Sequence, residues 1–81
     1  MDRLILKAYE SDNDTNTYAL RGQVIEVSND GASTIKIKAN GIEVDVLKGE
    51  FQQIEFGRFD SVKVTATSTA YRLYVYDYAG D

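Results

Sequence analysis

The stretch TIKIKANGIEVDVL, residues 34–47, reads as two short strands joined by a two-residue turn. Apolar and polar side chains alternate on both sides of Asn40-Gly41, and this alternation is typical of half-buried strands. Asn-Gly favours a type I′ turn, because both central residues of that turn take positive φ. The turn also sets the register, so Lys36 is expected opposite Asp45. The sequence therefore predicts a hairpin with one apolar face and one face of paired opposite charges.

The hairpin lies among further stretches rich in β-branched and aromatic residues, which favour strands. These stretches are residues 3–9, 17–28, 51–56, 61–66 and 71–78. No stretch has convincing helical spacing, and turn-forming residues separate the apolar runs. About six to eight short strands separated by turns predict an all-β fold, a small antiparallel β-sandwich of jelly-roll type, with a barrel as the alternative.

Three local patterns refine this expectation. Alternation within residues 3–9 places Leu4, Leu6 and Ala8 on one face of the first strand. The apolar positions of residues 17–28 change phase around Gly22, so the chain is expected to bulge there, to switch sheets or to form two strands. Residues 57–60 are expected to form a corner between strands.

Length and composition limit the classes of protein that this chain can belong to. Its 81 residues predict a single domain, residues 1–81, with a thin core. The absence of cysteine excludes disulfides and thiolate metal sites, and the absence of histidine removes the usual general base. A net charge of −4 argues against a sequence-independent nucleic-acid binder. No apolar run is long enough to span a bilayer, and the start of the chain does not resemble a signal peptide.

Without histidine or cysteine, catalysis would depend on carboxylates, serine or threonine, lysine or tyrosine, and the carboxylates are also the candidates for metal binding. Glu43 and Asp45 lie two residues apart on one strand face, but lysines are expected opposite both, so we predict neither an enzyme nor a cofactor. The acidic loop from Asp12 matches the start of an EF-hand calcium loop. It then departs from the motif, because Thr17 replaces the required glycine and Gln23 replaces the bidentate glutamate. We therefore predict no metal site, with a looser calcium site around Asp12 and Asp14 as the less favoured alternative.

The closing stretch YRLYVYDY, residues 71–78, carries a row of tyrosines. Alternation predicts that Leu73 and Val75 face the core, so the other face carries the expected partner interface. This interface comprises Arg72, Tyr74, Tyr76 and Tyr78. Tyrosine and arginine are enriched at protein–protein interfaces, and a row of exposed aromatic side chains usually marks an interaction site. The alternative is that the tyrosines line the core of the domain and that Leu73 and Val75 face outward.

Residues 34–78 resemble the strand pattern of small bacteriophage virion proteins that form spikes, pentons, decorations or tail parts. The resemblance consists of the alternating hairpin, then GEF at 49–51, FGRFDSVKV at 56–64 and the tyrosine-rich stretch at 71–78. It implies a structural protein that acts through contacts with other virion subunits, as a symmetric homo-oligomer. It also implies synthesis in the host cytoplasm and a final location in the virion. No catalytic or ligand-binding residue is carried over from it.

The runner-up function is a small binding module that recognises a host protein or a glycan through the tyrosines. A phage-encoded inhibitor of a host protein belongs to this second class. The two functions predict different solution masses, because the first requires a defined oligomer and the second is compatible with a monomer.

Overall fold

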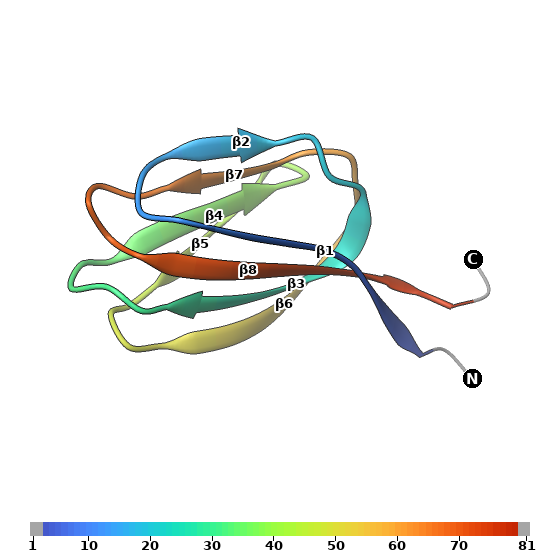
Figure 1. Cartoon of the computed structure of the whole chain (residues 1–81). Helices are drawn as coiled ribbons and strands as arrows, with labels where there is room; N and C mark the ends of the chain where they lie inside the picture. Colours follow the sequence, from blue (N-terminus) through green and yellow to red (C-terminus); the bar gives the residue numbers. More distant parts are fainter. Residues whose placement is uncertain (1–2, 80–81) are drawn as a thin grey trace.

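The computed structural model describes residues 3–79, which form eight β-strands (Figure 1). The strands are β1 (Leu4–Asp12), β2 (Asn16–Tyr18), β3 (Gly22–Asn29), β4 (Ile35–Ala39), β5 (Ile42–Val46), β6 (Phe51–Phe59), β7 (Val62–Thr65) and β8 (Tyr71–Tyr78). Residues 1, 2, 80 and 81, which include the start of the chain considered for a signal peptide, lie outside the described residues.

The strands form two four-stranded antiparallel sheets that pack face to face. One sheet has the order β1-β8-β3-β6 and the other has the order β2-β7-β4-β5. The pairing is nested, because β4 pairs with β5, β3 with β6, β2 with β7 and β1 with β8. The all-β antiparallel sandwich predicted from the sequence is confirmed.

The predicted hairpin is β4 and β5, with the expected turn and register. Lys36 lies opposite Asp45, with their nitrogen and oxygen 2.9 Å apart. Asn40 and Gly41 take φ values of 54° and 77°, as a type I′ turn requires. The apolar face is buried along the whole of β4 but unevenly along β5, the edge strand of its sheet, where Val46 is fully buried and Ile42 remains 49% exposed.

The core lies between the two sheets and is filled by alternate residues of the central strands. Ile25, Leu73 and Val75 contribute from one sheet, and Ile37 and Val64 from the other, all fully buried. Tyr71 is also buried at 1% exposure. Its hydroxyl lies 2.7 Å from that of Tyr18 and donates a hydrogen bond to the carbonyl of Asp14, so this polar group is satisfied inside the core.

Residues 17–28 form two strands, and Gly22 is the first residue of the second. β2 and β3 belong to different sheets, so the expected switch of sheets is confirmed. A Cβ atom at Gly22 would lie 2.6 Å from a methyl carbon of Val75 and 2.8 Å from the carbonyl oxygen of Tyr76. Glycine is required here because the backbones of β3 and β8 approach closely.

Two expectations were wrong, and a bulge explains each. The register between β1 and β8 shifts between Leu6 and Ala8, so Leu6 and Ala8 lie on opposite faces of the sheet instead of sharing one. The expected corner at residues 57–60 lies later, at Asp60 and Ser61, because β6 continues through Phe59. Gly57, with φ of 78°, absorbs the extra residues in a bulge opposite the start of β3.

The outer ends of β1 and β8 extend beyond the body of the sandwich as a two-stranded ribbon (Figure 1). Leu4 pairs with Tyr78 and Ile5 with Asp77, whereas the pairing of β3 with β8 stops at Tyr76. A two-stranded ribbon is marginally stable in water by itself. Apolar side chains on this ribbon therefore have little support from the rest of the molecule.

The turn geometry predicts how the hairpin responds to mutation. Replacing Asn40 and Gly41 together with valine forces two β-branched residues to positive φ, at a strain cost of about 1–3 kcal/mol per residue. It also removes the hydrogen bond from the Asn40 side chain to the carbonyl of Phe56. Chemical denaturation should show a larger fall in midpoint for this variant than for Lys36→Gln with Asp45→Asn, because exposed ion pairs contribute little. The opposite ranking would mean that the turn or the register differs from the one described.

Candidate functional site

The outer face of the β1-β8-β3-β6 sheet is the surface that the sequence singled out, and we call it the tyrosine face. It is formed by Leu6, Tyr9, Val24, Glu26, Glu55, Tyr74, Tyr76 and Tyr78, which share one side of the sheet through direct cross-strand pairing. Leu73 and Val75 are fully buried on the opposite side, while Tyr74, Tyr76 and Tyr78 are half-buried. The predicted parity of β8 is therefore confirmed, and the alternative in which its outer tyrosines line the core is wrong.

Hydrogen bonds hold two tyrosines of β8 in place on this face. The Tyr76 hydroxyl donates to the carboxylate of Glu26 at 2.6 Å, and the Tyr78 hydroxyl donates to that of Glu55 at 2.9 Å. The side-chain amide of Gln53 donates to the second oxygen of Glu26 at 2.9 Å. The hydrogen bond from Tyr76 favours the protonated hydroxyl and raises the pKa of Tyr76 to about 12.

Val24 shows that this face is packed even though it is an outer surface. It lies opposite Tyr76 on one side and Glu55 on the other, outside the core cluster, and is only 2% exposed. Neighbouring side chains of the same face must therefore cover it. The Tyr76 ring is thus anchored at both ends, by packing beside Val24 and by the hydrogen bond from its hydroxyl, so it loses little freedom when a partner covers it.

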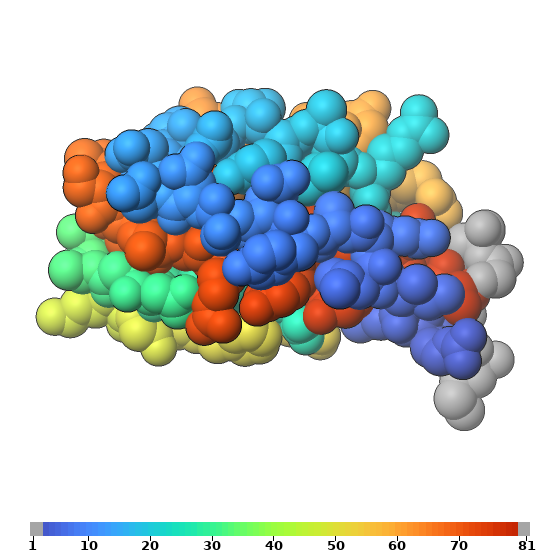
Figure 2. All heavy atoms as spheres, viewed as in Figure 1, coloured from blue at the N-terminus to red at the C-terminus, as the bar shows by residue number. Residues whose placement is uncertain are grey.

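The half of the tyrosine face near β1 is the more exposed half. The rings of Tyr9 and Tyr74 lie against each other, with centroids 5.0 Å apart at 45°. Tyr9 is 49% exposed and Leu6 is 51% exposed. Figure 2 shows the side chains of β1 in blue along the front of the molecule, beside those of β8 in red.

Sequence reasoning missed Leu6 and Tyr9 as members of this surface. The bulge after Leu6 places both residues on the same side of the sheet as Tyr74 and Tyr76. Their neighbour β8 comes from the other end of the chain. The apolar residues of the first strand could have suggested a contact surface. The strand that pairs with it could not be inferred from the neighbouring sequence.

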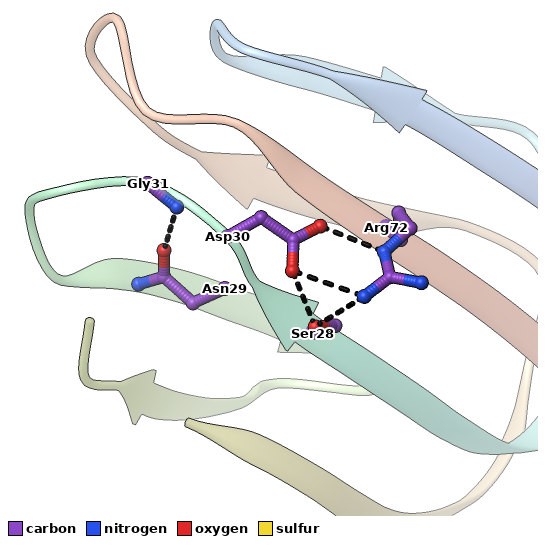
Figure 3. A network of polar contacts seen from close by, with 5 residues as sticks. All are labelled: Ser28, Asn29, Asp30, Gly31 and Arg72. Atoms are coloured by element: carbon purple, nitrogen blue, oxygen red, sulfur yellow. Dashed lines mark hydrogen bonds and ion pairs between the residues drawn. The ribbon is translucent and has the colours of Figure 1, made fainter. Parts of the chain in front are cut away.

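Arg72, the fourth residue of the predicted interface, is held by the turn that follows β3 (Figure 3). Its Nε donates to one oxygen of Asp30 at 2.7 Å, and its Nη2 donates to the other at 3.1 Å. The same Nη2 also donates to the Ser28 hydroxyl at 3.2 Å. This fork keeps the pKa of the Asp30 carboxyl below its ordinary value. Arg72 therefore fixes the β3–β4 turn, while its side chain remains 49% exposed.

Asn29, which lies between Ser28 and Asp30, supports this turn from the inside. Asn29 is 1% exposed and accepts a hydrogen bond from the amide of Gly31 (Figure 3). Its side-chain amide donates to the carbonyls of Ser33 and Val46. The end of the tyrosine face near Arg72 is consequently rigid.

A polar cleft of about 660 Å³ lies at the end of the sandwich that carries the hairpin turn. Two arginines and two aspartates line it, together with smaller groups: Arg21, Gly22, Asn40, Arg58, Phe59, Asp60, Ser61 and Asp77. These residues come from separate parts of the chain, so no local pattern predicted the cleft. Guanidinium, carboxylate, amide and hydroxyl groups together can hydrogen-bond a polar ligand, although Asp77 already accepts from Gln23 at 2.6 Å.

The acidic loop is held by hydrogen bonds within itself and to the connection between β7 and β8. Asp12 accepts from the amide of Asn13 at 2.7 Å and from the side chain of Asn16 at 2.6 Å, and Asp14 accepts from the amide of Ser68 at 3.2 Å. These bonds explain the loop conformation without an ion. Within residues 3–79, no three acidic side chains come together in a way that could hold a metal.

No family model matches the chain, and comparison with curated proteins and with solved structures gives no significant match. The part of the chain that the structure describes has no helix with the length and apolar character needed to cross a membrane.

The raised pKa of Tyr76 predicts a loss of stability in alkaline solution. Its pKa is about 12 in the folded protein and near the ordinary value of 10.0 in the unfolded chain. The folded state therefore binds more protons between these values, and the free energy of unfolding falls as pH rises through this range. Thermal melts between pH 9 and about 11.5 should show a shallower decline for Tyr76→Phe than for the wild type. Identical slopes would mean that the Tyr76–Glu26 bond is not maintained in solution.

The acidic loop predicts no response to calcium. Because Asp12 already accepts hydrogen bonds within the loop and Asp14 accepts one from Ser68, millimolar calcium should leave the melting temperature unchanged. A ligand that binds only the folded state must raise that temperature. A calcium-dependent rise that disappears in the Asp12→Asn, Asp14→Asn double variant would establish the alternative site.

Proposed function

We propose that this protein is a structural subunit of a bacteriophage particle, acting at the capsid, a spike or the tail, and that the tyrosine face makes its contacts with other subunits. The observation that carries the proposal is the exposure of Leu6 and Tyr9, at 51% and 49%, directly beside the half-buried tyrosines of β8. Contiguous apolar and aromatic surface on a small protein is typical of a surface that another chain covers.

The composition of the tyrosine face supports a protein partner. Tyrosine brings a large apolar ring and a hydroxyl that can be satisfied at an interface, and it is enriched among residues that dominate binding energy. The two carboxylates on this face, Glu26 and Glu55, already accept hydrogen bonds from tyrosine hydroxyls. Covering the face therefore does not leave these carboxylates without donors.

The size of the chain supports assembly as well. A domain of about 80 residues buries only about 60% of its unfolded surface, and such domains commonly gain stability from disulfides, metals or neighbouring subunits. The chain contains no cysteine and no histidine. Burial of the tyrosine face by a second chain would supply the missing apolar contacts.

The nested strand pairing supports the jelly-roll and virion parts of the proposal. Pairing β1 with β8, β2 with β7, β3 with β6 and β4 with β5 corresponds to one long hairpin folded over into two sheets. We assign this arrangement to the jelly-roll type, which occurs in capsid proteins and in lectins. A fold by itself does not determine function, so the tyrosine face remains the main support.

The polar cleft favours a second candidate, a monomeric binding module for a host protein or a glycan. Its mixture of arginine, aspartate, asparagine and serine side chains resembles the polar lining that orients a ligand in a binding site. An inhibitor of a host protein belongs to this class. Light scattering on the purified protein separates the two candidates, because a defined oligomer favours the first and a monomer at all concentrations favours the second.

The proposed contact surface predicts a specific assembly defect. Tyr9→Ser with Tyr74→Ser removes the two stacked rings, so the double variant should remain folded by circular dichroism but dissociate in sedimentation experiments. The expected weakening is at least about tenfold, because truncation of an interface anchor costs about 2 kcal/mol or more.

Leu47→Ser is the matched control for this double variant. Leu47 is 54% exposed and follows β5 in the other sheet, so its replacement removes a similar exposed apolar group elsewhere. The control should assemble like the wild type. If the double variant also assembles like the wild type, the tyrosine face is an ordinary surface. If it unfolds as a monomer, its rings serve the domain's own packing.

A further inference from the structure

The edge strand β1 offers an open hydrogen-bonding edge beside the tyrosine face. It is nine residues long, contains no proline and has one bulge, between Leu6 and Ala8; within residues 3–79 its only neighbour in the sheet is β8. Leu6, at 51% exposure, and Tyr9, at 49%, both lie on this strand. Long apolar edge strands are templates for pairing with another chain, and soluble proteins usually protect them.

The opposite edge of the same sheet is protected. The Gln52 side chain in β6 donates to the carbonyl of Asp45 at 3.1 Å, and Asn40 donates to the carbonyl of Phe56 at 3.1 Å. These bonds tie β6 to the β4–β5 hairpin. Pairing through β6 would have to displace these contacts, whereas pairing through β1 would not.

The charges along β1 are segregated. Arg3 and Lys7 lie in or just before its first half, and Glu10 and Asp12 lie in its second half. A parallel copy would place like charges opposite each other, whereas an antiparallel copy places the basic half of each strand beside the acidic half of the other. Cross-strand pairs of opposite charge stabilise a sheet, and like-charge pairs destabilise it.

We propose that β1 pairs antiparallel with β1 of a second copy of this chain, about a two-fold axis between Lys7 and Ala8, so that the two β1-β8-β3-β6 sheets become one continuous sheet. Because of the bulge between Leu6 and Ala8, this axis places Leu6 opposite Tyr9 of the copy on the same outer face. The inference rests on the proposed role in assembly and names one partner surface for it. A two-fold axis perpendicular to the sheet keeps both tyrosine faces on the same side. Each Tyr9 and Leu6 then lies beside the edge of the second copy, and the dimer presents one broad aromatic surface to further subunits.

A single-cysteine scan tests this geometry directly, because the chain has no cysteine of its own. Cysteine is introduced singly at each position of β1, and each variant is oxidised with copper phenanthroline. An antiparallel two-fold brings identical residues together only at the axis, and residues three positions away are already separated by about 20 Å. Disulfide-linked dimers should therefore peak around Ala8→Cys and be absent at Leu4→Cys and Ser11→Cys. A flat profile, or a peak at the ends of β1, would overturn the proposal.

Charge reversal provides a second test that leaves the backbone unchanged. Lys7→Glu and Glu10→Lys should each weaken the dimer about tenfold, and the double variant should recover most of the lost affinity because it restores opposite charges across the axis. Lys48→Glu, in the turn after β5, is the matched control and should have no effect. Additive losses in the double variant would contradict antiparallel pairing.

The two tests also separate this inference from the proposed function. An oligomer that gives no cross-linking peak in β1 but is lost in the Tyr9, Tyr74 double variant supports assembly and rejects pairing through β1. A wild type that stays monomeric at all concentrations and gives no cross-link rejects both. Circular dichroism on each cysteine and charge variant identifies any that fail to fold, and the remaining positions still define the profile.

Discussion

The strict alternation of β8 between its two neighbours, β1 and β3, is the constraint on which the rest of the structure depends. Leu73 and Val75 point into the core without exposure, so every intervening side chain must lie on the outer face. Those side chains are Arg72 and the tyrosines, and each finds a partner on a neighbouring element. Arg72 reaches Asp30, Tyr74 lies against Tyr9, and Tyr76 reaches Glu26. One strand thus fills the core, fixes a turn and builds the candidate interface.

Local patterns predicted the parts of this structure that depend on neighbouring residues in the chain. The β4–β5 hairpin needs only its own alternation and the positive φ of Asn40 and Gly41, so its register follows from the sequence. The choice of which side chains of β8 face the core follows from its alternating sequence. A slip of one residue would bury the tyrosines and expose Leu73 and Val75. The sheet switch at Gly22 was also predicted from the sequence, because the apolar phase changes there. The structure adds that only glycine fits against Val75 at this position.

The remaining features depend on contacts between distant segments, which local patterns do not encode. The bulge between Leu6 and Ala8 reverses the parity of β1, and only its pairing with β8 shows that Tyr9 lies beside Tyr74. Gly57 resembled a corner residue, yet a bulge lets β6 continue past it. Arg72 resembled a free interface residue, but Asp30 holds its guanidinium. Each difference reflects tertiary pairing that overrides a correct local preference.

The uneven exposure of the tyrosine face connects the two proposals. Toward β3 and β6, the apolar side chain of Val24 is buried, and Glu26 accepts hydrogen bonds from both Tyr76 and Gln53. Toward β1, Leu6 and Tyr9 remain about half exposed, and the backbone groups on the outer edge of the strand are unpaired within the described residues. A partner that covered only the middle of the tyrosine face would leave Leu6, Tyr9 and the edge of β1 exposed to water. A copy docked along β1 would pair the free backbone groups of this strand and would also cover the Leu6 and Tyr9 side chains. Both the unpaired backbone groups and the exposed apolar side chains lie on β1, so this edge strand is the expected contact between copies.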